Sequence, residues 1–281
     1  MRGNPLVPSE LGVVVISSNF DFSYIMAIIA LKAWYLSQYE PIPELEKRPH
    51  DIRLSKNSLL KSALRADFLE DSADIKKSAW FQRYLEGETV EFYIEGSGGY
   101  AIANIDLSSH EIYFIKQTVM AQMEPTIFLA HQNEYLESSQ ALKEGLQAAI
   151  EKFNQRSRLP LTLVESQQNS TPVRLSSTSS RKIRKCLLFI ADGTPITSIA
   201  GKESSRLLLS PSVCVEVGYA TANKRLEQIV IAQMYRKELS GQYPFDLPSS
   251  QILAFTGSQE LNRLLPQLLE MQLQRFNLFS K

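Results

Sequence analysis

The residues with the clearest chemical potential lie in the stretch SPSVCVEVGYATANKR, residues 210–225. Its one carboxylate, Glu216, stands among Val213, Val215 and Val217. A carboxylate in apolar surroundings needs a polar partner, a shifted pKa or a functional use, because burying an unpaired charge is costly. Glu216 is therefore the first candidate for a catalytic group.

A helix is the predicted setting for Glu216. Ser210 followed by Pro211 is typical of a helix start, since a side-chain oxygen can cap the helix and proline suits its first position. Asn223 could end it. An apolar stripe at helical spacing lies beside Glu216 (Val213, Val217 and Ala220). The alternation of the segment would also fit a strand, but the proline and the need for a crossover connection favour a helix.

The chain from residue 124 onward alternates strand and helix patterns. Strands are expected in PTIFLA, LPLTLVES, KCLLFIAD, LEQIVIAQ and SQILAFTG. Helices are expected over 138–153, 210–223 and 258–276, with Pro266 as a potential kink, and a polar loop over 166–182. This alternation predicts an α/β fold: a flavodoxin-like, parallel five-stranded sheet with helices on both faces.

The first part of the chain, residues 1–120, is predicted to be a smaller α+β domain of unknown role, before a second domain at 124–281. A strand is expected at 13–16, followed by a helix from about Ser23, and another helix is expected over 55–72. Residues 88–116 read as a three-stranded meander. The glycine-rich EGSGGY within it is interpreted as a hairpin turn, because no helix start follows it as in a phosphate-binding loop.

Polar residues follow two of the predicted strands. His131 and Gln132 come after the first strand, and Asp192, Gly193 and Thr194 come after the third. Ligands of parallel α/β sheets bind at the carboxyl ends of the strands. The helix that carries Glu216 is expected to start on the same side, so these residues together form the predicted site.

The segment IADGT is followed by SPSVCVEVGYATANKR and then by a predicted strand. This order resembles the TIR-like and nucleoside 2-deoxyribosyltransferase-like superfamily. Its members commonly show a strand ending in an acidic residue, a helix of the form N-V-x-x-E-L-G-x-A and another strand. Ser212 stands here for the Asn and Val217 for the Leu. The matching positions are Val213, Glu216, Gly218 and Ala220. YPFDLPSSQILAF, residues 243–255, is similar to the P-F-D segment before the last strand of bacterial TIR-like proteins.

The resemblance implies N-glycosidic chemistry on an NAD-like nucleotide, with Glu216 as the catalytic carboxylate and no cofactor. TIR-type enzymes split NAD into nicotinamide and an ADP-ribose product, and deoxyribosyltransferases use the equivalent glutamate as a nucleophile. A carboxylate near the anomeric carbon can stabilise or trap the positive charge that develops on the sugar. The implied substrate-binding residues are His131, Gln132, Asp192, Thr194, Ser210, Ser212 and Tyr219.

Structural explanations of the same residues stay open. Glu216 could pair with Lys224 or Arg225 on the helix surface, and Asp192 could cap the turn that follows it. His131 could be a buried histidine without a catalytic role, and the basic run RKIRK, 181–185, a solvated entry into a strand. The alternative function is a non-catalytic regulator whose C-terminal part binds a nucleotide or a protein.

Composition excludes several classes of protein. The chain of 281 residues has 30 Lys and Arg and 30 Asp and Glu, and a neutral chain lacks the cation excess of a nucleic-acid-binding protein. Cys186 and Cys214 are too few for a disulfide framework and are expected to be reduced. No signal peptide, long apolar run or metal-ligand spacing is present in the sequence. We therefore expect a cytoplasmic, soluble protein without a metal, and a homo-oligomer.

Overall fold

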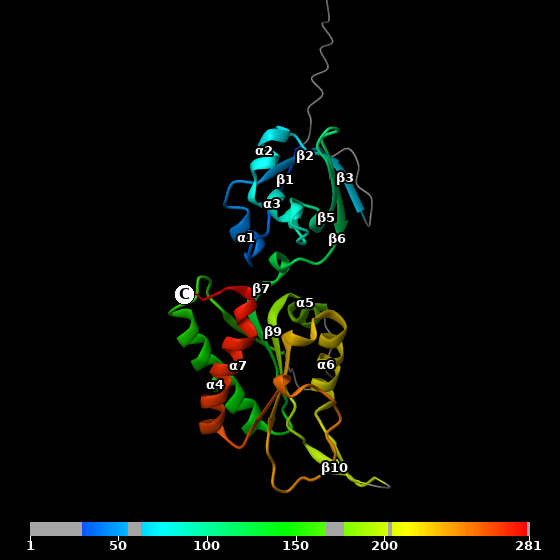
Figure 1. Cartoon of the computed structure of the whole chain (residues 1–281). Coiled ribbons are helices and arrows are strands. Elements are labelled where there is room, and N and C mark those ends of the chain that lie inside the picture. Colours follow the sequence, from blue (N-terminus) through cyan, green and yellow to red (C-terminus); the bar gives the residue numbers. More distant parts are fainter. Residues whose placement is uncertain (1–29, 56–62, 167–176, 202–203, 280–281) are drawn as a thin grey trace, which may run out of the picture.

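The computed structural model describes residues 30–55, 63–166, 177–201 and 204–279. Two sheets follow one another along the chain (Figure 1). The expected strand at 13–16 lies outside the described residues.

The second sheet is parallel and five-stranded, as predicted. Its strands lie in the order β13-β12-β9-β7-β8, which is the 2-1-3-4-5 order of flavodoxin-like folds when the strands are numbered along the chain. All seven residues of the central strand β9 are buried, as expected of a strand covered on both faces. The strands are β7 (Glu124–Ala130), β8 (Thr162–Glu165), β9 (Cys186–Asp192), β12 (Ile229–Met234) and β13 (Ile252–Phe255).

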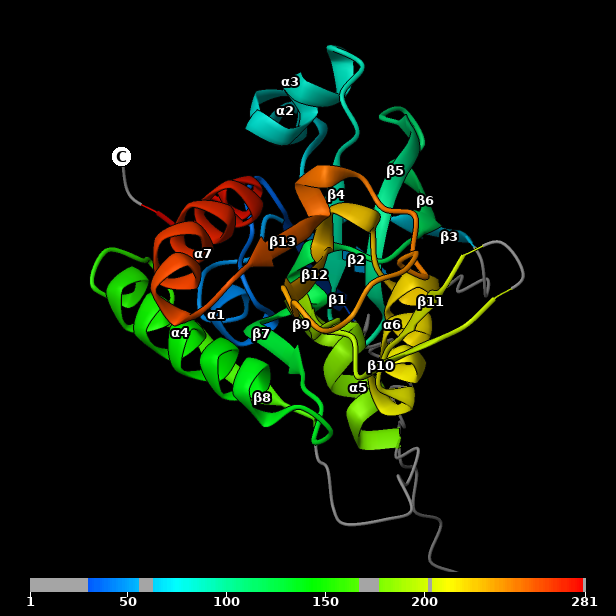
Figure 2. The ribbon, with the colours of Figure 1, turned by 90° about the horizontal axis from the view of Figure 1, so that it is seen from below.

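Four helices cover this sheet, two on each face (Figure 2). Helices α4 (Leu136–Asn154) and α7 (Ser258–Leu273) pack on one face, against residues that include Leu188. Helices α5 (Ser177–Lys185) and α6 (Pro211–Asn223) pack on the other, against residues that include Phe189. Successive residues of a strand point to opposite faces, so one apolar strand supplies both cores.

The first sheet is antiparallel and six-stranded, in the order β2-β1-β4-β5-β6-β3. A bridge between Leu54 and Phe68 links its two ends. Both tryptophans, Trp34 and Trp80, are buried in this part of the molecule. Its elements are β1 (Ala30–Tyr35), α1 (Ile42–Leu45), β2 (Ile52–Ser55), β3 (Ala63–Asp67), α2 (Ser72–Lys77), α3 (Ala79–Leu85), β4 (Glu91–Ile94), β5 (Gly98–Asp106) and β6 (Glu111–Lys116).

The predicted meander is confirmed as β4, β5 and β6. Gly96 in the turn between β4 and β5 and Gly98 at the start of β5 have φ angles of 67° and 110°, which favour glycine. The EGSGGY segment is therefore a hairpin turn. The proposed division of the chain at residues 120–124 stays a prediction.

Two helices predicted in the first part are wrong where the structure describes them. The helix expected from about Ser23 gives way to strand β1 at residues 30–35. The helix expected over 55–72 gives way to strand β3 at 63–67. There Ala66 and Phe68 are buried while Arg65 is exposed. Buried side chains therefore recur every second residue, as in a strand, and not every 3.6 residues, as in a helix.

The polar loop expected over 166–182 is also corrected. Residues 177–185 form helix α5, so RKIRK, 181–185, is the end of a helix that leads directly into strand β9 and not part of a loop. Ile183 is its buried residue, packed against Phe128 and Phe189, and this single apolar contact was too weak a pattern to predict a helix. The long connection after β9 contains a hairpin, β10 (Thr197–Ile199) and β11 (Arg206–Leu208).

None of the helices in the described ranges combines the length and the apolar composition that a membrane crossing requires.

Candidate functional site

Helix α6 carries Glu216 and begins where predicted, with Pro211 in its first turn and its end at Asn223. The Ser210 side chain does not cap the helix as expected. Its hydroxyl instead donates to Glu134 Oε1 at 3.1 Å and lies 2.8 Å from the Ser212 hydroxyl. Ser210 and Ser212 therefore form one polar pair at the start of α6, next to the loop that follows β7.

The Glu216 side chain is half-buried, and one of its carboxylate oxygens lacks a described hydrogen-bond partner. Its Oε2 atom is buried and no described residue donates a hydrogen bond to it. Burial raises the pKa of Glu216 from 4.5 to about 7, because a low-dielectric environment disfavours the charged form. Burial therefore makes this carboxyl more basic than an ordinary glutamate.

The predicted ion-pair alternative for Glu216 is not seen among the described residues. Lys224 Nζ instead donates to the Cys186 carbonyl at 2.6 Å. Arg225 follows the end of α6 and lines a cavity whose lining does not include Glu216. Glu216 thus keeps its burial without either cation.

Asp192, at the end of β9, is fully buried, and both of its carboxylate oxygens accept hydrogen bonds. Its Oδ2 accepts hydrogen bonds from Ser138 Oγ at 2.6 Å and Ser139 Oγ at 2.7 Å. Its Oδ1 accepts from the Thr194 backbone N–H at 3.1 Å, which is the turn-capping role that the sequence left open. Asp192 thereby fastens the first turn of α4 to the end of the central strand.

Gln132 and Thr194 join the same buried network. Gln132 Nε2 donates to the Thr194 carbonyl at 2.9 Å, and the Met234 backbone N–H donates to Thr194 Oγ1 at 2.9 Å. Gln132 Oε1 is buried and accepts no hydrogen bond from a described residue. Three of the predicted residues, Gln132, Asp192 and Thr194, are therefore brought together at the carboxyl edge of the sheet.

His131 lies at the end of β7, where its Nδ1 is 3.1 Å from Ser166 Oγ. Burial is the main reason that the pKa of His131 is lowered, and it favours the neutral ring. Tyr219, by contrast, lines a cavity of about 460 Å³ with Arg181 and Arg184 of helix α5. The structure therefore places Tyr219 beside α5, and no described contact joins it to Asp192.

Three residues of the site escaped the sequence reasoning. Ser138 and Ser139 supply the donors to Asp192, and Tyr243 donates from its hydroxyl to the Gly193 carbonyl at 2.9 Å. Gly193 leaves no room for a side chain, because a Cβ there would lie 2.2 Å from that hydroxyl. Two features of the sequence could have indicated these residues: the pair of serines that follows HQNE, and the tyrosine of the YPFD segment.

Neither cysteine forms a disulfide, and burial raises the pKa of the Cys186 thiol to about 11. In the described part of the chain, no three His, Cys, Asp or Glu side chains gather in a way that could hold a metal ion.

No protein-family model matches the chain, and no curated protein does. Among solved structures it is similar to the flavodiiron core of Flv1 from Synechocystis sp. PCC6803, with 13% identity and a TM-score of 0.33. That similarity covers 54% of this chain and 36% of the Flv1 chain, so the match spans about a third of the length of Flv1. A fragment described as a lipoprotein from Peptoclostridium difficile 630 has 15% identity and a TM-score of 0.28, with 53% and 98% covered.

Proposed function

We propose that the chain is a nucleotide-processing N-glycosidase that cleaves the nicotinamide–ribose bond of an NAD-like nucleotide, with Glu216 as its catalytic carboxylate. The observation that carries the proposal is the uncompensated Glu216 side chain. Its Oε2 atom is buried, on a helix that starts at the carboxyl edge of a parallel sheet, and no described cation pairs with it. The motif resemblance of residues 210–225 points to the same residue.

The reaction requires the ionised form of Glu216, a carboxylate that burial makes more basic than an ordinary glutamate. When the bond between the anomeric carbon and the nicotinamide nitrogen breaks, positive charge develops on the ribose ring. An ionised carboxylate close to that carbon stabilises the charge, more strongly where water is excluded. Water then adds to the anomeric carbon, which gives free nicotinamide and an ADP-ribose product.

The polar pair Ser210 and Ser212 at the start of α6 would contact a phosphate of the substrate in this proposal. Gln132 Oε1, which has no described donor, would accept a hydrogen bond from a substrate hydroxyl or amide. We further propose that the protein acts in the cytoplasm as a homo-oligomer.

One observation favours a second candidate function, a non-catalytic nucleotide or protein sensor. Both Asp192 oxygens are already occupied by Ser138, Ser139 and the Thr194 N–H. Asp192 is also fully buried, so it could hold a ribose hydroxyl only if the residues around it moved. A sensor that uses the same edge without catalysis needs no such movement.

The test is NAD turnover by the purified full-length chain, followed by chromatography of nicotinamide and ADP-ribose. We expect turnover in the wild type and its loss in both Glu216→Ala and Glu216→Gln. Glu151→Gln, on the exposed side of α4, is the matched control and should turn over NAD like the wild type. The ionised form of Glu216 is the active one, so the rate should rise with pH through about 7.

Two results would count against the glycosidase. Turnover that persists in Glu216→Gln would remove that residue from the chemistry. An absence of turnover in the wild type at assembling concentrations, together with measurable nucleotide binding, would favour the sensor.

A further inference from the structure

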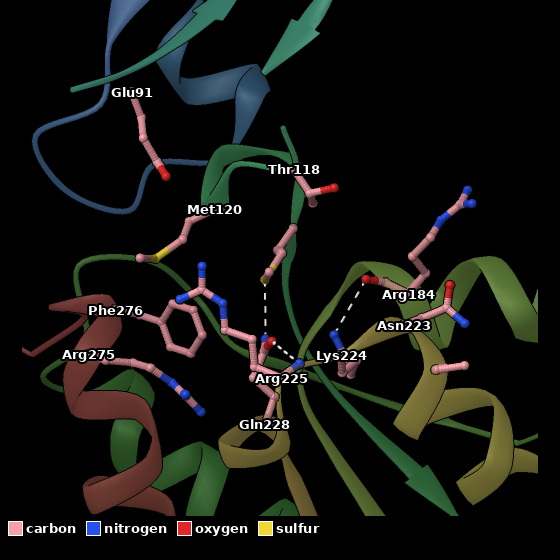
Figure 3. A pocket seen from close by; sticks show the side chains of 12 residues that line it. Glu91, Thr118, Met120, Arg184, Asn223, Lys224, Arg225, Gln228, Arg275 and Phe276 are labelled. Carbon is pink, nitrogen blue, oxygen red and sulfur yellow. Dashed lines mark hydrogen bonds between the residues drawn. The ribbon is translucent and has the colours of Figure 1, made fainter. Parts of the chain in front are cut away.

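A cavity of about 420 Å³ lies between the two sheets, at the amino end of the parallel sheet (Figure 3). We call it the amino-edge cavity, because its lining includes residues just before β7, β9 and β12. Such a volume is within the range of small-molecule sites in proteins. Its lining residues are Glu91, Thr118, Met120, Met123, Arg184, Ala222, Asn223, Lys224, Arg225, Gln228, Arg275 and Phe276.

The amino-edge cavity concentrates positive charge. Arg184, Lys224, Arg225 and Arg275 line it, and Glu91 is the one acidic residue among the lining side chains. The whole chain has equal numbers of acidic and basic residues, so the excess of cations is local. Figure 3 shows Glu91 extending from the first sheet toward this group of cations.

These cations are only partly compensated by the protein. Arg275 pairs with Glu227 at 3.4 Å, and Lys224 donates to the Cys186 carbonyl. No described residue accepts a hydrogen bond from the guanidinium group of Arg184 or Arg225, within the ranges that the structure covers. Arg225 also lowers the pKa of Arg275, after burial, by repulsion between the two charges. A bound anion would relieve this repulsion.

We propose that the amino-edge cavity binds a phosphate-bearing small molecule of nucleotide size. Arg225 and Arg275 would hold the phosphates, because a guanidinium group donates two parallel hydrogen bonds to phosphate oxygens. Lys224 adds charge, and Met120 with the edge of Phe276 forms an apolar wall for the rest of the ligand. Several cations opposite one carboxylate favour a ligand with more than one negative charge.

This site is separate from the proposed catalytic one. Glu216 does not line the cavity. On helix α6 it lies six residues before Ala222, the first residue of that helix in the lining, which corresponds to about 9 Å at the rise of an α-helix. The ligand would also touch both parts of the molecule. Glu91 and Thr118 come from the first sheet and the segment after it, whereas all four cations come from the second part of the chain. Binding there does not depend on Glu216 chemistry.

The experiment is calorimetric titration of the full-length chain with ADP, AMP, adenosine and pyrophosphate. We expect ADP and pyrophosphate to bind, AMP to bind more weakly and adenosine not to bind. Arg225→Ala should weaken ADP binding roughly tenfold or more, since one charge-assisted contact is lost. Glu91→Gln should tighten it several-fold, because the one acidic side chain of the cavity becomes neutral.

Two control variants separate the sites and the causes. Arg263→Ala removes an exposed arginine of α7 and should leave ADP affinity unchanged. Glu216→Gln changes a residue that does not line the cavity and should also leave ADP affinity unchanged. Misfolding cannot produce the increase in ADP affinity that we expect for Glu91→Gln. This variant therefore tests the proposal even if Arg225→Ala does not fold.

The proposal is overturned if no phosphate probe binds more tightly than about 1 mM. It is also overturned if ADP binds with equal affinity to the wild type, Arg225→Ala and Glu91→Gln. ADP binding that is lost in Glu216→Gln but kept in Arg225→Ala would assign the nucleotide to the carboxyl edge instead.

Discussion

The buried carboxyl of Glu216 makes the free energy of unfolding depend on pH with a defined sign. Its pKa is about 7 in the folded chain and 4.5 ordinarily, so the folded state keeps a proton that the unfolded state releases between these values. Stability therefore falls as pH rises from about 4.5 to about 7, and the full penalty is present above pH 7. Each pH unit of displacement corresponds to about 1.4 kcal/mol, so the penalty at pH 8 is about 3 kcal/mol.

Glu216→Gln is the perturbation that isolates this effect. Glutamine has nearly the same shape and no charge, so its own contribution does not change between pH 5 and pH 8. We expect the variant to gain about 2–3 kcal/mol of stability relative to the wild type over that interval. Replacing the carboxyl by an amide also changes the stability by an amount that does not depend on pH. That amount cancels when the change between pH 5 and pH 8 is compared.

The assay is urea unfolding followed by far-ultraviolet circular dichroism at pH 5, 6, 7 and 8. His131 also titrates there, but with opposite sign, because its lowered pKa makes stability fall as pH drops. That contribution is common to both chains and cancels as well. Glu151→Gln on the exposed side of α4 should run parallel to the wild type. A gap between Glu216→Gln and wild type that stays constant within about 0.5 kcal/mol would refute the reasoning.

Three further substitutions test the packing of the two edges, each by the midpoint of urea unfolding. Gly193→Ala should cost about 1–3 kcal/mol, because its Cβ would lie 2.2 Å from the Tyr243 hydroxyl; a neutral result would mean that the YPFD segment moves freely. Asp192→Ala should cost about 3 kcal/mol, since it leaves buried serine hydroxyls without their acceptor, and an unchanged midpoint would contradict that network. Lys224→Met should cost about 1–2 kcal/mol through the lost bond to the Cys186 carbonyl, and a stabilised variant would contradict it.

The parallel sheet was predictable mainly from its central strand, which is fully buried. Its residues 186–191, CLLFIA, have no polar side chain, and the residues that follow must lie at the carboxyl edge. The same logic placed Gln132, Asp192 and Thr194 close together, and the structure joins them by hydrogen bonds. Topology alone carries this part of the prediction.

The partners of those residues were not predictable to the same degree. Ser138 and Ser139 reach Asp192 only because α4 starts directly over the end of β9, which depends on the loop after β7. Tyr219 was assigned to the site because it lies within the motif around Glu216, yet it lies beside α5. The sequence of α5 is so polar that it was predicted to be a loop. Strand β3 was mistaken for a helix because leucines in 55–72 recur at spacings that fit both periods.

The placement of the two tryptophans makes intrinsic fluorescence a selective reporter. Trp34 and Trp80 are both buried in the antiparallel part, and residues 124–281 contain no tryptophan. Indole emission therefore follows the unfolding of the first sheet alone, while circular dichroism follows the helices of both parts. Coincident curves would mean one cooperative unit. Separate curves would give each sheet its own free energy of unfolding and would show that the chain divides between β6 and β7.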